Sequence, residues 1–102
     1  MPVFAVQYNY VDDVAGLDKH RPAHREFLRG MIADGTLRVS GPFAADGGGR
    51  GALLVFRETS ADALRARLAH DPFATAGLIA ETVVREWTVM SGPVRDAVAD
   101  GA

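Results

Sequence analysis

The first segment of the chain alternates between apolar and polar side chains. Gln7 and Asn9 point to one side, while the residues of Val3–Val11 on the other side are large and apolar: Phe4, Val6, Tyr8 and Tyr10. A period of two residues is typical of a β-strand with one buried face. The pattern therefore predicts a first strand whose aromatic side chains face the core.

The next segment carries its apolar residues at helical spacing. Between His20 and Gly35 the large apolar residues share one helix face: Phe27, Leu28, Met31 and Ile32. Proline is tolerated in the first turn of a helix, and glycine commonly follows its last turn. Pro22 and Gly35 therefore predict a helix from His20 to Gly35.

Two short strands and a glycine-rich connection come next. Leu37–Phe43 alternates, and Pro42 indicates that this strand ends there or lies at a sheet edge, because proline cannot donate to a ladder. Residues 46–51 read Asp-Gly-Gly-Gly-Arg-Gly and predict a hairpin connection. Ala52–Phe56 is apolar on both faces, which predicts a central strand covered from both sides.

A second helix is predicted after Glu58. Thr59 or Ser60 can cap its first turn with a side-chain oxygen. Its buried stripe is formed by apolar residues at helical spacing: Ala61, Leu64 and Leu68.

The remaining segments are a turn, a strand and a tail. Asp71 precedes Pro72, and the residue before a proline is excluded from the helical region. Asp71 is therefore predicted to end the second helix and to cap a short turn, Pro72–Ala76, which Gly77 closes. Glu81–Met90 is predicted as the last strand. The tail, residues 91–102, has weak helical character around Val94–Ala99.

The predicted order of elements, βαββαβ, defines an α+β fold of the ferredoxin-like kind. Right-handed crossovers place both helices on one face of a four-stranded antiparallel sheet. We assign residues 1–90 to this domain and residues 91–102 to a C-terminal tail. Several strands are apolar on both faces, so the bare face would expose a larger patch than monomers usually do. A homodimer packed sheet against sheet is the expected solution.

Composition removes several classes of function. The 102 residues fit one domain, and the net charge of −2, with basic residues scattered among acidic ones, disfavours nucleic-acid binding. The absence of cysteine excludes disulfides, zinc–thiolate sites and a thiol nucleophile. The N-terminal residues carry no charged leader, and no apolar stretch is long enough to span a membrane, so we expect a cytoplasmic protein.

His24 is the best candidate for chemistry. It lies one turn before Phe27 and Leu28, so it projects from the apolar stripe of the first predicted helix toward the sheet. An unpaired polar group there would cost roughly 1–3 kcal/mol, so His24 must find a partner or line a cavity. Imidazole ordinarily titrates close to neutral pH, so in a pocket it can both accept and donate a proton. From spacing alone, a structural histidine bonded to a backbone carbonyl is the favoured interpretation.

Asp71 is the natural companion of His24, because a carboxylate can orient an imidazole and stabilise its cation. The simpler interpretation of Asp71 is a helix cap, and one carboxylate can serve both purposes. His20 and His70 are expected to be solvated. No ligand set for a metal emerges from three histidines without regular spacing.

Aromatic residues can either wall a small pocket or fill the core, and the core interpretation is the stronger. The set is Tyr8, Tyr10, Phe43, Phe73 and Trp87. Ser40 has no base at fixed spacing, so a serine nucleophile is not expected.

Four short motifs in order resemble the YCII-related (YciI-like) family. They are Arg21-Pro22-Ala23-His24, Asp34-Gly35, Ser40-Gly41-Pro42 and Asp71-Pro72-Phe73, within a match from about Val3 to Met90. The resemblance implies a dimeric α+β barrel with His24 and Asp71 as the catalytic pair and no cofactor. It places Gly41 and Pro42 in the wall of a substrate pocket that we expect Tyr8, Ser40 and Phe73 to complete.

The hypothesis that follows is a cofactor-independent acid–base enzyme, of lyase, dehydrochlorinase or isomerase type, acting on a small aromatic or enolisable molecule. His24 would move the proton and Asp71 would fix its tautomer. Two alternatives stay open: a non-catalytic dimeric domain that binds a metabolite or supports another enzyme, and a metal-free monooxygenase of similar fold.

Overall fold

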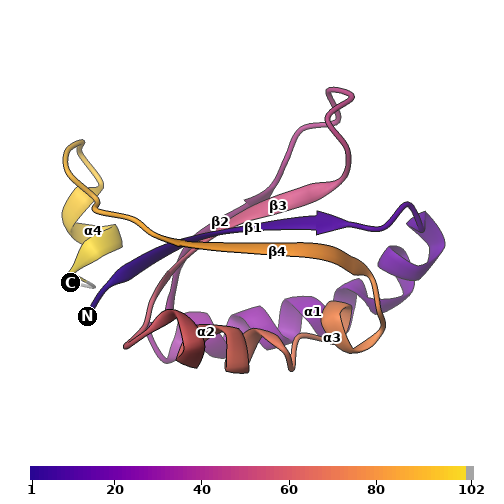
Figure 1. The fold of residues 1–102 in the computed structure, drawn as a ribbon, viewed down its shortest axis with the longest axis horizontal. Helices are drawn as coiled ribbons and strands as arrows, with labels where there is room; N and C mark the ends of the chain where they lie inside the picture. Colours follow the sequence, from indigo (N-terminus) through magenta and orange to yellow (C-terminus); the bar gives the residue numbers. More distant parts are fainter. Residues whose placement is uncertain (101–102) are drawn as a thin grey trace.

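The computed structural model describes residues 1–100 as one sheet with helices on one side. The elements in chain order are β1 (Val3–Tyr10), α1 (Val14–Ala33), β2 (Leu37–Pro42), β3 (Gly51–Arg57), α2 (Ala61–Leu68), α3 (Pro72–Thr75), β4 (Ile79–Glu86) and α4 (Arg95–Ala99). Figure 1 shows α1, α2 and α3 below the sheet, and α4 at the end of the molecule where the two termini lie. The predicted βαββαβ order is confirmed, with α3 and α4 added to it.

The four strands are antiparallel and lie in the order β2-β3-β1-β4. Val6 of β1 is paired with Leu54 of β3 on one side and with Val84 of β4 on the other. This is the predicted ferredoxin-like sheet, with β3 in the interior and β2 at an edge. Pro42 is the last residue of β2, where its missing N–H costs no ladder bond.

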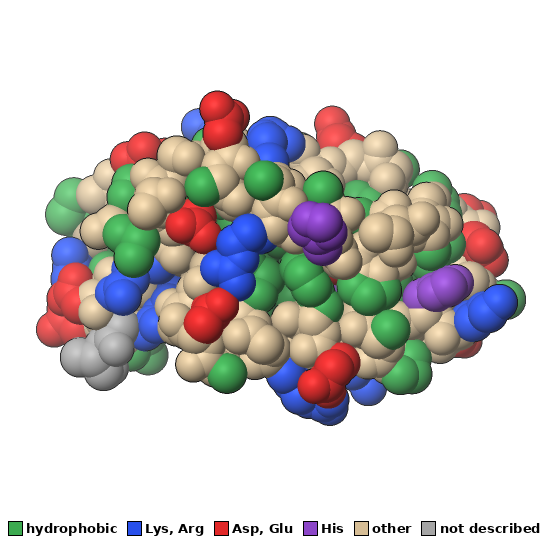
Figure 2. Space-filling model, turned by 90° about the horizontal axis from the view of Figure 1, so that it is seen from below, with side chains coloured by type: hydrophobic (Ala, Val, Ile, Leu, Met, Phe, Trp, Pro, Cys, Tyr) green, Lys and Arg blue, Asp and Glu red, His purple; other side chains and the backbone are tan. Residues whose placement is uncertain are grey.

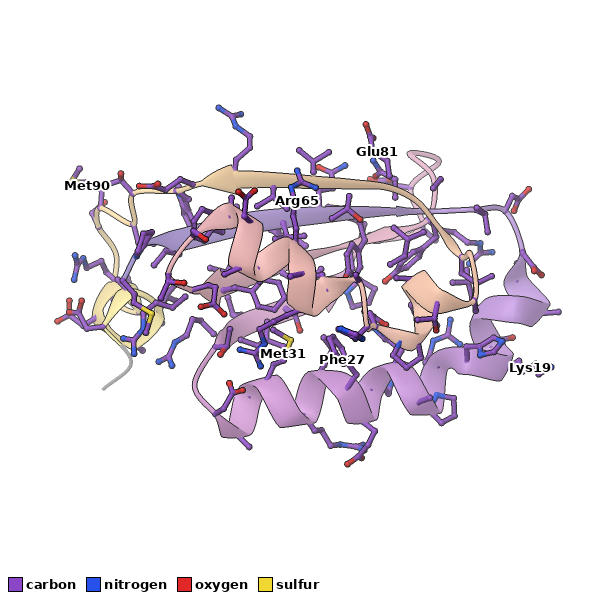
Figure 3. All side chains as sticks on the ribbon, turned by 60° about the horizontal axis from the view of Figure 1, so that its bottom comes forward. Lys19, Phe27, Met31, Arg65, Glu81 and Met90 are labelled. Carbon is purple, nitrogen blue, oxygen red and sulfur yellow. The ribbon has the colours of Figure 1, made fainter. Side chains whose placement is uncertain are left out.

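The core lies between the sheet and the helices. Its buried members from β1 and β3 alternate along the strands: Phe4, Val6, Tyr8, Leu54 and Phe56. Met31 of α1 and Leu64 of α2 close over them. In Figure 3 the side chains of Phe27 and Met31 rise from α1 toward this layer. Seen from the helix side in Figure 2, charged side chains surround the hydrophobic groups that fill the space between the helices.

Helix α1 begins earlier than the sequence predicted. It starts at Val14 rather than at His20, and the Asp13 carboxylate accepts a hydrogen bond of 2.9 Å from the Gly16 N–H. Pro22 therefore lies inside the helix and His20 does not precede it. Leu17, buried against Phe73 and Leu78, supplies the packing that stabilises the added turns despite the bond lost at Pro22.

Two further expectations were wrong in detail. Ile32 was placed on the buried stripe but is 58% exposed, because Met31 occupies that position against the sheet. The last strand runs from Ile79 to Glu86 instead of Glu81 to Met90. β4 pairs only with β1, and the two strands are antiparallel. The Trp87 N–H donates to the carbonyl of Val3, the first residue of β1, at 2.8 Å, so the residues after Trp87 extend past the start of β1.

The other boundaries agree with the sequence patterns. Ser60, rather than Thr59, caps α2, and its hydroxyl accepts from the Ala63 N–H at 3.0 Å. Gly77 follows α3 with a φ of 72°, as a closing glycine should. The predicted tail contains α4, and Arg38 of β2 donates to the Ala97 carbonyl at 2.6 Å. Residues 101 and 102 of that tail lie outside the described residues.

The glycine-rich segment joins β2 to β3 as a hairpin. At its end, a Cβ on Gly51 would clash with the Tyr8 carbonyl oxygen, so only glycine allows β1 and β3 to approach here. Between residues 1 and 100, no helix is both long enough and apolar enough to cross a membrane.

Candidate active site

His24 is held by the carboxylate of Asp71, which lies 47 residues further along the chain. It sits on the buried face of α1, with 7% of its surface exposed. Its Nδ1 lies 2.8 Å from Asp71 Oδ1 and 2.9 Å from Oδ2. Because an ionised carboxylate can only accept a hydrogen bond, Nδ1 must carry the ring proton. This N–H therefore donates the hydrogen bond to Asp71. The favoured backbone-carbonyl interpretation of His24 is therefore wrong.

Asp71 is completely buried and collects three donors. Besides His24, the Tyr8 hydroxyl donates to Oδ2 at 3.2 Å and the Phe73 N–H donates to Oδ1 at 2.9 Å. Asp71 is thus both the N-cap of α3 and the partner of His24, as its position before Pro72 allowed. A buried charge of this kind is tolerated because its oxygens are satisfied by donors.

Phe73 fixes the plane of the imidazole. The two rings are stacked, with centroids 4.0 Å apart and planes within 9° of each other. Tyr10 in turn meets Phe73 edge to face at 5.4 Å. The Asp71-Pro72-Phe73 segment therefore supplies both the hydrogen-bond partner and the stacking surface of His24, so the ring has little freedom to turn.

The other ring nitrogen of His24, Nε2, is not used in the contact with Asp71. Within residues 1–100, Nε2 has no hydrogen-bond partner, yet it does not belong to the buried unpaired atoms. His24 lines a pocket of about 260 Å³, close to the lower end of ligand-sized cavities. The wall comes from β1, α1, β2, β3 and α3, with lining residues Tyr10, Arg21, His24, Arg25, Leu28, Ser40, Gly41, Pro42, Ala52, Leu54 and Phe73.

The two tyrosines near Asp71 stay protonated at neutral pH. Burial raises the pKa of Tyr8 well above its usual range, and the neighbouring Asp71 charge raises it further. Burial raises the pKa of Tyr10 to about 12, with Asp71 adding to the effect and Arg21 opposing it. Tyr8 is therefore a permanent donor to Asp71.

The structure brings most of the expected pocket residues together. Ser40, Gly41, Pro42 and Phe73 line the cavity beside His24. Tyr8 is not among the lining residues, because it is completely buried, with its hydroxyl bonded to Asp71.

Two aromatic residues considered for the same pocket lie elsewhere. Phe43 and Trp87 line shallow grooves on the opposite face of the sheet. The reason is strand alternation, which places Phe43 with Val39 and Leu53 on the face that the helices do not cover.

Tyr10, Arg21 and Arg25 are the lining residues that sequence reasoning left without a firm role. The signal for the two arginines was present, since positions 21, 24, 25 and 28 share one side of a helix. The sequence pattern pointed to His24 on that side because it is the polar residue that interrupts the apolar stripe of the helix.

No group of three or more potential metal ligands from His, Asp and Glu occurs among the residues that the structure describes. His70 is exposed at the end of α2, and His20 is half-buried on α1.

The fold and the pair together define the class: a ferredoxin-like α+β domain with a buried histidine–aspartate pair beside a small pocket. The chain belongs to the YCII-related domain family, whose sequence profile matches residues 1–88. No curated protein sequence is significantly similar to it.

Solved structures confirm the ferredoxin-like α+β fold, which this chain shares with dimeric α+β barrel proteins. The 5-chloro-2-hydroxyhydroquinone dehydrochlorinase of Burkholderia phenoliruptrix, in complex with 2,5-dihydroxybenzoquinone, is 25% identical with a TM-score of 0.72, over 84% of this chain and 93% of that one. An antibiotic biosynthesis monooxygenase is 12% identical with a TM-score of 0.56, over 89% and 100% of the two chains. Rv0793 from Mycobacterium tuberculosis is 15% identical with a TM-score of 0.54, over 91% and 99%. The last two likenesses show the fold alone.

Proposed function

We propose that this protein is a cofactor-independent acid–base enzyme acting on a small aromatic or enolisable molecule. The observation that carries the proposal is the fixed imidazole: Asp71 holds Nδ1 of His24, while Nε2 remains unpaired at the pocket. This is the arrangement that general base catalysis requires, because one ring nitrogen is oriented and the other can take a proton. Asp71 would stabilise the imidazolium that forms.

The dehydrochlorinase of similar fold supports the substrate class. By its name it acts on a chlorinated hydroxyquinol, and its structure holds a dihydroxybenzoquinone. A single six-membered ring of this kind suits the 260 Å³ cavity, whose wall includes Phe73 and Tyr10. We infer that the chain takes a phenolic or enolic compound of comparable size.

The proposed step is a proton transfer. A substrate O–H or C–H bond breaks, the proton moves to Nε2 of His24, and the electron pair stays on the substrate as a phenolate or enolate. From an enolate whose neighbouring carbon carries a leaving group such as chloride, the electron pair forms a C=C bond to that carbon, chloride departs, and His24 releases the proton to solvent, which gives a lyase. If that carbon carries no leaving group, the proton returns to another carbon, which gives an isomerase.

Hydrogen–deuterium exchange tests the proton transfer before the natural substrate is known. Small quinols, phenols and 1,3-dicarbonyl compounds are incubated with the protein in D₂O, and loss of their C–H signals is followed by proton NMR. We expect accelerated exchange for a subset of these compounds. Wild-type protein that binds them tightly yet exchanges nothing would instead identify a non-catalytic binding domain.

We further propose that two copies pair through the sheet face that the helices leave open. Large apolar side chains are exposed there: Val39 at 51%, Leu53 at 45% and Trp87 at 46%. Such a patch is unusual for a monomer, and a symmetric pair would cover it in both copies.

Leu53→Glu is expected to convert this dimer to a monomer, because it places a charge in the centre of the patch. Sedimentation velocity measures the mass of each species. Ile32→Glu is the matched control, since Ile32 is equally large and, at 58%, more exposed than Leu53 but lies on α1, on the other side of the sheet. A monomeric wild-type protein, or a dimer that survives Leu53→Glu, would refute the pairing.

A further inference from the structure

The α1 side of the pocket carries positive charge, and Arg25 on this side is exposed at the surface. Arg21, His24 and Arg25 all line the cavity from α1, at positions one turn apart or adjacent. Among the described residues that line it, none is an aspartate or glutamate. Asp71, the nearest buried carboxylate, does not line the cavity and is occupied by His24, Tyr8 and the Phe73 N–H.

The two arginines differ in how their charge is used. Arg21 donates to Asp18 at 2.5 Å, so a carboxylate of its own helix already neutralises it. Arg25 forms no ion pair with any carboxylate within residues 1–100, although Arg29, one turn further along α1, pairs with Glu26 at 2.9 Å. An unpaired guanidinium offers a planar set of donors suited to a carboxylate or an acidic enolate.

We propose that Arg25 binds an anionic group of the substrate, so that the pocket selects small organic acids over neutral compounds of the same shape. This inference rests on the proposed function and narrows its substrate class. The acidic group would face Arg25 on the α1 side of the pocket, and the ring or enolisable carbon would lie deeper, beside His24 and the Phe73 wall. Since the region is partly open to solvent, the attraction must weaken as salt increases.

The contribution of the ligand's negative charge to binding is measured with two compounds that differ by one carboxylate: 2,5-dihydroxybenzoate and hydroquinone. Isothermal titration calorimetry at neutral pH and low salt measures both dissociation constants. We expect the acid to bind wild-type protein about five- to tenfold more tightly than hydroquinone. Arg25→Gln should remove this preference by weakening only the acid, and added salt should reduce it in the wild type.

Arg29→Gln is the matched control, because it removes the same charge from the same helix but does not touch the cavity. It should leave both dissociation constants within about twofold of wild type. The proposal is wrong if the two ligands bind wild-type protein equally, if neither binds, or if both arginine variants weaken the acid alike. These are binding results, so they are independent of the deuterium-exchange assay, whose failure would count against proton transfer alone.

Discussion

Replacing His24 with glutamine is expected to lower the rate of deuterium exchange, or of turnover, by about 10²–10⁴-fold, the range typical of a lost general base. Glutamine is similar in length and its amide can donate to Asp71, so the buried carboxylate keeps a partner. It cannot accept and release a proton near neutral pH. The Michaelis constant should change little, since the pocket wall stays in place.

The controls for this substitution are the other two histidines. His20→Gln and His70→Gln remove one imidazole from α1 and one from the end of α2, and neither of these histidines lines the pocket. Both should keep the wild-type rate. If His24→Gln retained full exchange activity while circular dichroism showed an intact fold, the proton-transfer proposal would be wrong.

Replacing Asp71 with alanine should destabilise the protein by about 3–5 kcal/mol, because a buried donor left without its acceptor costs roughly 1–3 kcal/mol. Three donors lose their acceptor at once: His24 Nδ1, the Tyr8 hydroxyl and the Phe73 N–H. The cap of α3 is lost with them. Urea denaturation followed by circular dichroism measures the change in the free energy of unfolding.

Two further variants separate stability from chemistry. Asp18→Ala breaks the exposed ion pair to Arg21 and should cost less than about 1 kcal/mol, as surface pairs do. Asp71→Asn keeps an oxygen acceptor for the Phe73 N–H, so it should be more stable than Asp71→Ala. Its amide can donate to Nδ1, which would move the imidazole proton to Nε2 and remove the base. An Asp71→Ala protein as stable as wild type would show that the three hydrogen bonds contribute nothing net.

Much of the fold follows from local patterns. The alternation through Phe4, Val6 and Tyr8 predicted β1 because a strand exposes every second side chain to the same face. Pro42 predicted an edge because its backbone lacks a donor. These signals depend only on near neighbours in the chain, so the sequence contains them in full. The early start of α1 was missed because its stabilising contact, from Leu17 to Phe73 and Leu78, joins distant segments.

The candidate site likewise has features that the sequence predicts and features that only the tertiary structure determines. By itself the sequence determined that His24 interrupts an apolar helix face and that Asp71 begins a turn where a carboxylate could pair with it, and the family resemblance supported that pairing. Only the tertiary structure decided that they touch, since 47 residues separate them and the packing of α1 against α3 sets their distance. It also decided that the hydroxyl of Tyr8, 63 residues from Asp71, donates to the Asp71 carboxylate and that Arg25 lines the pocket. A hydrogen bond needs atoms placed to within a few tenths of an ångström, and only the packed core fixes positions that closely.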